Sequence, residues 1–259
     1  MSTRKTVLGI DTSTLTASVA IVRDDLVLAA GESSVNTHSQ RLLGLIDEAL
    51  DAAGLTLGDL SAIAIGAGPG SFTGLRIGMA TAKGLAFASD KPLWAVSSLA
   101  AMALSAADAQ AALADRDDTL IAPILDARRQ EIFVGFYRLV GARVEPVSDE
   151  AVMSPGDLGR ALARVFAATG RVRAVALGDG VGVYRTELDQ LAASLAGPDA
   201  LTFIDGLDTP AAATVARLAA QGEREDLVIG GAPTYIRLAE AEIKYPDGNP
   251  GGTFQPESG

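Results

Sequence analysis

The chain has 259 residues, of which 48% are hydrophobic and 20% are charged, and its formal net charge is −11. This composition excludes an intrinsically disordered chain, and the length suffices for two modest domains with cores of their own. The absence of cysteine excludes disulfides and thiolate metal sites, and the acidity disfavours extensive contact with nucleic-acid phosphates.

Apolar periodicity predicts the same order of elements in each half of the chain. The first half is expected to contain strands at 7–10, 16–22 and 26–32, a helix ending at 53, a strand at 62–65, a helix at 72–88, a strand at 93–96 and a helix at 97–113. The second half is expected to contain strands at 120–125, 131–138 and 143–147, a helix at 155–167, a strand at 174–177, a helix at 183–195, a strand at 201–204 and a helix at 210–220.

This order, βββαβαβα occurring twice, predicts an α/β fold made of two ribonuclease-H-like halves, the layout of the actin-like ATPase superfold. The predicted halves span residues 1–113 and 114–245. The Gly- and Pro-rich end, 246–259, is expected to be a mobile tail. An ordinary doubly wound α/β domain is the alternative fold.

No apolar run is long enough to span a bilayer, because Lys83 interrupts the best candidate at 77–88. We therefore expect a soluble, cytoplasmic protein without membrane contact.

The turn after the first strand carries Asp11, Thr12 and Ser13. ATPases of the actin-like superfold place Asp-x-Gly-Thr/Ser here, where the acid serves the metal-bound nucleotide. Ser13 occupies the glycine position, which removes the easy approach of backbone to phosphate. These residues are candidate nucleotide contacts, or they simply form the turn.

The most distinctive motif is Gly-Pro-Gly-Ser-Phe-Thr-Gly-Leu-Arg-Ile-Gly at 68–78, between a buried strand and a helix. Ser71 or Thr73 can cap that helix, whose bare N–H groups suit an anion. The motif lacks the Gly-Lys-Ser/Thr of a Walker loop. A purely structural turn is the alternative.

Two further groups are candidates for a nucleotide or phosphate cleft in the second half. Arg128 lies beside Arg129, Asp126 and Glu131, where it either pairs with an anion or forms part of a solvated hairpin. Gly178 and Gly180 form a stretch that is short for an adenosine site.

The helices ending at 53 and 88 carry more apolar residues than one sheet face requires. We expect them to form a helix-bundle interface with a partner; the alternative is that the second helix is merely buried. The expected interface residues are Leu42, Leu45, Ile46, Ala49, Leu75, Met79 and Ala82.

The motif at 68–78 resembles the signature of the TsaB family. The first hairpin at 9–13, the segments 126–133 and 178–180, and the segment 233–237 resemble that family too, so the resemblance extends from about residue 5 to residue 237. The family is the non-catalytic paralogue of TsaD in bacterial tRNA threonylcarbamoyladenosine (t6A) biosynthesis.

The resemblance implies a scaffold subunit of the complex that modifies adenosine 37 of tRNA. It implies pairing with TsaD, which it activates, association with the ATPase TsaE, and a homodimer in isolation. It implies that tRNA is bound only through the complex. We expect no cofactor in the isolated chain, with ATP or ADP and Mg possible at a shared site of the complex.

Two other functions stay open. An ATP-using kinase or ATPase of the same superfold would require an intact phosphate hairpin. A glycoprotease-like peptidase would require a base, and His38 is the one histidine of the chain. With one histidine and no cysteine, a transition-metal site would need Asp and Glu almost alone, a ligand set that suits hard cations instead, so we expect no metal.

Overall fold

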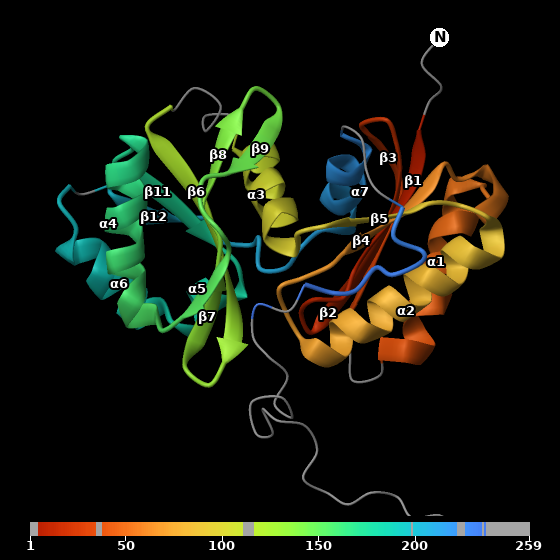
Figure 1. The fold of residues 1–259 in the computed structure, drawn as a ribbon, viewed down its shortest axis with the longest axis horizontal. Helices are drawn as coiled ribbons and strands as arrows, with labels where there is room; N and C mark the ends of the chain where they lie inside the picture. Colours follow the sequence, from red (N-terminus) through yellow and green to blue (C-terminus); the bar gives the residue numbers. More distant parts are fainter. Residues whose placement is uncertain are drawn as a thin grey trace, which may run out of the picture.

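The computed structural model describes residues 5–34, 38–110, 117–197, 199–221, 226–234 and 236. These residues form two lobes, each built on a mixed β-sheet (Figure 1). The expected tail at 246–259 lies outside the described residues.

The first sheet has the strand order β3-β2-β1-β4-β5. Strands β1 to β3 form an antiparallel meander, and β4 and β5 add to β1 in parallel, as helical crossovers require. The strands are β1 (Thr6–Asp11), β2 (Thr16–Arg23), β3 (Leu26–Ser34), β4 (Ala62–Gly66) and β5 (Leu93–Val96).

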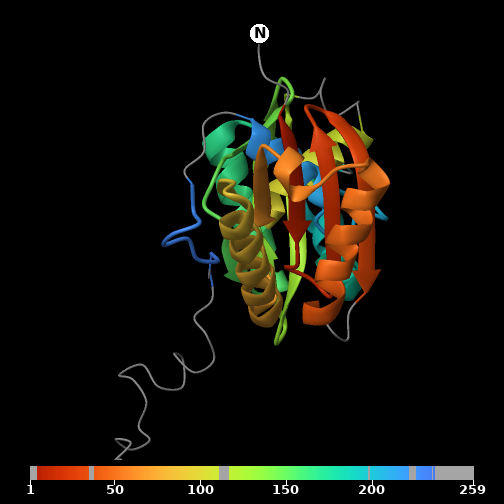
Figure 2. The same ribbon diagram turned by 90° about the vertical axis from the view of Figure 1, so that its right-hand side faces the viewer.

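Helices cover both faces of this sheet because successive side chains of a strand point to opposite faces. Leu8 and Ile10 of β1 pack in the cluster that α1 (His38–Ala53) and α2 (Phe72–Ser89) complete, whereas Val7 packs in the cluster of α7 (Ala212–Ala220). Figure 2 shows α1 and α2 on the outer side of the sheet. A one-turn 3-10 helix, Leu57–Asp59, precedes β4.

The second sheet repeats the order as β10-β7-β6-β11-β12. Its strands are β6 (Thr119–Arg128), β7 (Glu131–Val134), β10 (Ala151–Met153), β11 (Arg173–Leu177) and β12 (Leu201–Phe203). The helices of this half are α4 (Leu158–Thr169), after a 3-10 turn at Pro155–Asp157, and then α5 (Asp179–Val183) and α6 (Arg185–Ser194). The duplicated α/β fold of the actin-like superfold is therefore confirmed.

Three details of the second half differ from prediction. The strand expected at 131–138 is two strands, because β6 pairs with β7 along one end and with β8 (Tyr137–Val140) at Ile121. The strand expected at 143–147, β9 (Arg143–Pro146), forms a hairpin with β8, and the third meander strand is β10. The helix expected at 183–195 is α6, and the short helix α5 that precedes it was not predicted.

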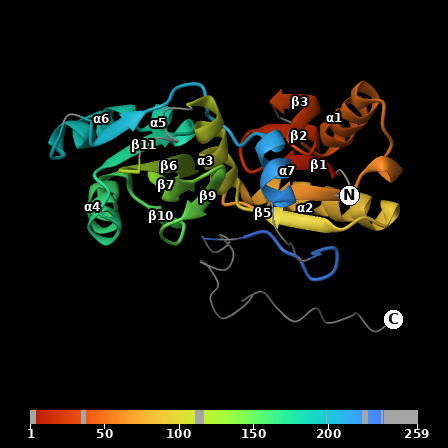
Figure 3. The same ribbon diagram turned by 90° about the horizontal axis from the view of Figure 1, so that it is seen from above.

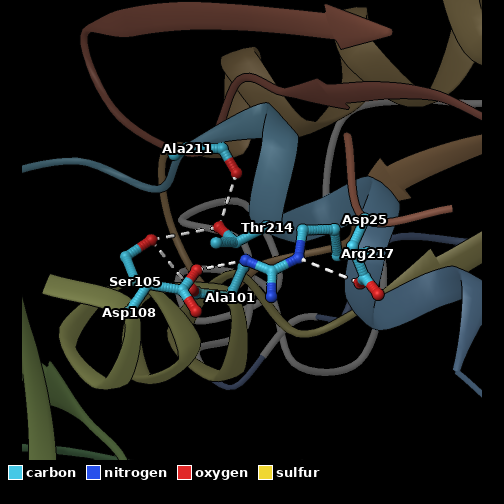
Figure 4. Close-up of polar contacts among 7 residues, drawn as sticks. All are labelled: Asp25, Ala101, Ser105, Asp108, Ala211, Thr214 and Arg217. Atoms are coloured by element: carbon cyan, nitrogen blue, oxygen red, sulfur yellow. Dashed lines mark hydrogen bonds and ion pairs between the residues drawn. The ribbon is translucent and has the colours of Figure 1, made fainter. Parts of the chain in front are cut away.

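Helices α3 (Ser98–Ala109) and α7 lie between the two sheets (Figure 3). Each is the last helix of its half, and they contact each other. Figure 4 shows the polar contacts at their crossing: Arg217 of α7 pairs with Asp108 of α3 and, at 3.6 Å, with Asp25. The hydroxyls of Ser105 and Thr214 lie 3.1 Å apart. These contacts join the last helices of the two halves.

The segment 226–234 returns to the first lobe and covers the free edge of β5. The Leu227 N–H donates to the Leu93 carbonyl at 2.9 Å, and Asp226 Oδ1 accepts the Leu93 N–H at 2.9 Å. Farther along, the Thr234 N–H donates to the Ala67 carbonyl at 2.8 Å. The segment thus satisfies edge groups that would otherwise stay unpaired.

Candidate functional site

The turn between β1 and β2 is buried, with Asp11 at its start. Asp11 Oδ1 accepts hydrogen bonds from the Ser13 N–H at 2.8 Å and from the Ser13 hydroxyl at 2.6 Å. Asp11 Oδ2 accepts the Ser98 hydroxyl at 2.7 Å, and Ser98 Oγ in turn accepts the Gly68 N–H at 3.3 Å. Both carboxylate oxygens are therefore bonded inside the protein.

Gly66 at the end of β4 and Gly70 in the loop before α2 allow the chain to close over this turn. A Cβ at Gly66 would collide with the Asp11 carboxylate, and a Cβ at Gly70 would collide with the Ser13 backbone. The Thr12 hydroxyl donates to the Gly74 carbonyl in α2 at 2.8 Å. The glycines of the distinctive motif thus serve the close approach of two backbone segments.

The N-terminus of α2 meets the carbonyl group of this same turn. Ser71 is the N-cap, and its hydroxyl accepts the Gly74 N–H at 3.3 Å, as predicted for a cap. The Ser71 N–H donates to the Ser13 carbonyl at 2.6 Å. Thr73 lies exposed on the first turn of the helix. The Ser13 carbonyl oxygen therefore occupies the position at the N-terminus of α2 where a bound anion was predicted.

Burial raises the pKa of Asp11 above its ordinary value of 3.8, because it removes the carboxylate from water. The hydrogen bonds from Ser13 and then Ser98 act in the opposite direction. Asp11, Thr12 and Ser13 are each exposed by no more than 2%. The three predicted nucleotide contacts and Ser71 thus form one cluster whose polar groups bond to one another.

The second half contains an equivalent turn at the end of β6. Asp126 Oδ1 accepts the Arg128 N–H at 2.8 Å, the same Asx turn that Asp11 makes with Ser13. Asp126 also pairs with the Arg128 guanidinium at 3.0 Å and accepts the Tyr184 hydroxyl at 3.2 Å. The Asp126 N–H donates to Asp179 Oδ1 at 2.9 Å, and burial raises the pKa of Asp179.

The glycines predicted beside this turn have a packing role. A Cβ at Gly178, where φ is 110°, would collide with the Ile124 carbonyl of β6, and a Cβ at Gly180 would lie 2.8 Å from the Ile124 side chain. Arg128, Gly178 and Gly180 therefore gather around the end of β6, in the lobe opposite the Asp11 cluster. Asp179 and Tyr184 complete this group; only the position of Asp179 between two glycines marked it in the sequence.

Neither a metal cluster nor a membrane span is found among the described residues. No three histidine, cysteine, aspartate or glutamate side chains of that part of the chain lie close enough together to hold a metal ion. Likewise, no helix within the described ranges is both long and apolar enough to cross a bilayer.

The side chains expected at a partner interface are buried in this chain. Leu45 is 7% exposed and Met79 is 4% exposed, and both pack in the core between the first sheet and its outer helices. The sheet of this chain therefore covers the side chains that were expected to meet a partner, and their role in a partner interface stays a prediction. All seven expected interface residues are buried: Leu42, Leu45, Ile46, Ala49, Leu75, Met79 and Ala82.

Comparison with known proteins identifies the family. The family model described as TsaD, tRNA N6-adenosine threonylcarbamoyltransferase, matches residues 31–245. A TsaB protein of Bacillus subtilis, described as a tRNA threonylcarbamoyladenosine biosynthesis protein, is 32% identical over 242 residues, covering 93% of this chain and 97% of that protein. The TsaB protein of Haemophilus influenzae is 40% identical over 139 residues, covering 54% of this chain and 56% of that protein.

Solved structures give the same result. The crystal structure of a Pseudomonas aeruginosa protein described as similar to peptidase YeaZ superposes with a TM-score of 0.72 at 31% identity, covering 90% of this chain and 100% of that one. YeaZ from the same organism gives a TM-score of 0.69 at 30% identity, covering 89% and 99%.

The doubled sheet and the family-model match define a protein of the TsaD type within the actin-like superfold. Within that class, the chain belongs to the TsaB (YeaZ) family.

Proposed function

We propose that this chain is the non-catalytic subunit of the machinery that makes threonylcarbamoyladenosine in tRNA, pairing with and activating a TsaD-type transferase. The relatives described as TsaB biosynthesis proteins support the role in this modification. The observation that carries the non-catalytic part is the Asp11 carboxylate, which is 1% exposed and has both oxygens hydrogen-bonded within the chain.

An actin-like ATPase requires its first hairpin to reach a metal-bound nucleotide. Here Gly66 and Gly70 bring the loop before α2 against that hairpin, and Ser71 donates to the Ser13 carbonyl. Opening this cluster would break buried hydrogen bonds to a carboxylate, each contributing about 1.5–3 kcal/mol. The geometry therefore supports a scaffold over a kinase or ATPase. Among the side chains that the structure describes there is no histidine, the base that a serine peptidase would need.

The outer surface of α1 and α2 is the proposed docking face for the transferase. Leu43 is 48% exposed and Phe87 is 81% exposed. The same two helices carry small exposed residues: a Cβ added at Gly44 or Gly84 would meet nothing within 4 Å, and Ala80 is exposed. Small residues on a helix face allow another helix to approach closely, so this surface fits a helix pair on the partner.

The same face would serve self-pairing when the transferase is absent, which is the homodimer we propose for the isolated chain. We also propose that the ATPase TsaE joins the assembled pair, that ATP or ADP with Mg is held at a shared site there, and that tRNA is bound through the complex. We propose that the chain acts in the cytoplasm, because tRNA is modified there.

A reconstitution with single omissions tests the proposal. The transferase subunit, TsaE, tRNA and the threonylcarbamoyl-adenylate donor are combined with or without this chain, and modified nucleoside is measured. We expect product only when this chain is present, and neither product nor ATP turnover from this chain alone. Modification by the other components at an undiminished rate would refute the proposal.

A further inference from the structure

The hairpin between β6 and β7 ends in a strained turn. The φ angles of Arg128, Arg129 and Gln130 are 60°, 56° and 60°, a region that residues with a Cβ avoid and glycine occupies freely. None of the three is glycine, and all three are exposed. Strained conformations of this kind persist where the surrounding structure or a function maintains them.

Comparison with the first half shows that this turn is not needed to fill a core. Asp11 and Asp126 make the same Asx turn, with the same 2.8 Å bond to the N–H two residues later. The first turn is sealed under the glycine loop, with Ser13 at 2% exposure. At the equivalent place the second turn has Arg128, whose side chain is 66% exposed.

Two carboxylates near the tip, those of Asp126 and Asp179, bind groups of this chain. The Asp126 side chain is only 6% exposed and is occupied by the Arg128 N–H, the Arg128 Nη1 atom and the Tyr184 hydroxyl. Asp179 accepts the Asp126 N–H. The ion pair therefore fixes one edge of the Arg128 guanidinium, while most of the side chain faces solvent.

We propose that the tip formed by Arg128, Arg129 and Gln130 contacts the phosphate backbone of the RNA substrate in the assembled complex. This inference rests on the proposed function. Guanidinium groups match phosphate oxygens in geometry and charge. Since the chain carries a net charge of −11, contact with RNA has to be confined to a local basic feature of this kind.

The shape of the tip favours RNA over a free nucleotide. The hairpin projects at the lower end of its lobe, away from the amino-terminal end of β1 (Figures 1 and 2). Small ligands bind in concave sites that surround them, whereas a projecting hairpin fits the backbone of a macromolecule. The tip then adds a few phosphate contacts to an RNA that the partner mainly holds.

The test measures tRNA affinity of the purified pair of this chain and its TsaD-type transferase, by fluorescence anisotropy over a salt series. Affinity for RNA falls as salt rises, and each lost phosphate contact reduces the steepness of log affinity against log salt by about 1. We expect Arg129→Gln to lower the slope by about 1 and the double change with Arg128→Gln to lower it by about 2. Arg138→Gln is the matched control, because Arg138 is also an exposed hairpin arginine paired with a carboxylate, Glu145.

Gln130→Gly separates charge from backbone strain, since it relaxes one left-handed residue and keeps both arginines; we expect it to retain tRNA affinity. A wild-type salt slope in the double variant would overturn the inference. So would loss of ADP affinity with tRNA affinity unchanged, which would assign the tip to a free nucleotide, or loss of pairing with the transferase. If the wild-type chain itself formed no pair, the proposed function would fail, and this inference with it.

Discussion

Replacing Gly84 with arginine separates the stability of this chain from its pairing. Gly84 lies inside α2, is exposed, and has open space where a Cβ would stand. Glycine is less favourable than arginine in a helix interior by about 1 kcal/mol, so Gly84→Arg is expected to stabilise the isolated chain by about that amount. For a protein of this size, that raises the midpoint of thermal unfolding by about 2–4 °C.

The same change places a long cation where a partner helix approaches. Overpacking and an unpaired charge at such a contact cost about 2 kcal/mol or more, which weakens pairing with the transferase at least about 30-fold. Calorimetric titration against the transferase measures this loss, and thermal unfolding measures the gain. Gly182→Arg is the matched control: Gly182 is also an exposed helix glycine with open space, but it lies in α5.

Two results would refute this reasoning. Pairing of Gly84→Arg with wild-type affinity would remove α2 from the interface. A lower unfolding midpoint in Gly84→Arg, with no lowering of the midpoint in Gly182→Arg, would show that other residues of this chain fill the space beside Gly84.

Three further predictions concern the interior of the first lobe. Leu45→Ala is expected to lower the free energy of urea unfolding by about 2–5 kcal/mol, because Leu45 is a core residue and its removal leaves a cavity; a loss below about 0.5 kcal/mol would contradict its burial. Gly66→Ala is expected to cost at least about 2 kcal/mol in the same measurement, since its Cβ has to displace the Asp11 carboxylate; wild-type stability would contradict that contact. The raised pKa of Asp11 means that the folded chain binds a proton more readily than the unfolded chain, so this group favours folding most below pH 3.8 and its contribution declines as pH rises through the folded pKa. Asp11→Asn is expected to remove that decline from the stability profile, and an unchanged profile would contradict the buried charge.

The first half could be predicted well from the sequence because its meander strands are short apolar runs separated by turn residues. Elements at β1, β2 and β4 needed no tertiary information, since their residues are buried on both faces. The second half was less predictable because β6 changes partner along its length, from β8 to β7. Pairing partners leave no mark in the periodicity of one strand, so the third meander strand was assigned to β9.

The sequence predicts where the candidate site lies, but not that its polar groups are buried and bonded to one another. The sequence places Asp11 and Ser71 at the ends of a strand and a loop, and the structure brings them together. Only the structure shows that Ser98 completes the bonds of Asp11, since Ser98 is 87 residues away in the chain. The side chains that meet the sheet were not recognised for a related reason: an apolar stripe in a sequence does not distinguish the side that meets its own sheet from the side that meets a partner. Here the sheet covers Leu45 and Met79, and Leu43 and Phe87 stay exposed on the outer side.

A comparison of two variants in the reconstituted modification assay tests the central claim, that this chain acts through its outer helices and not through the buried cluster around Asp11. Folded Asp11→Asn and folded Gly84→Arg are each supplied to the transferase mixture, and modified nucleoside is measured per mole of folded chain. The account predicts product near the wild-type rate with Asp11→Asn and little product with Gly84→Arg. Loss of product with Asp11→Asn together with full product from Gly84→Arg would contradict it.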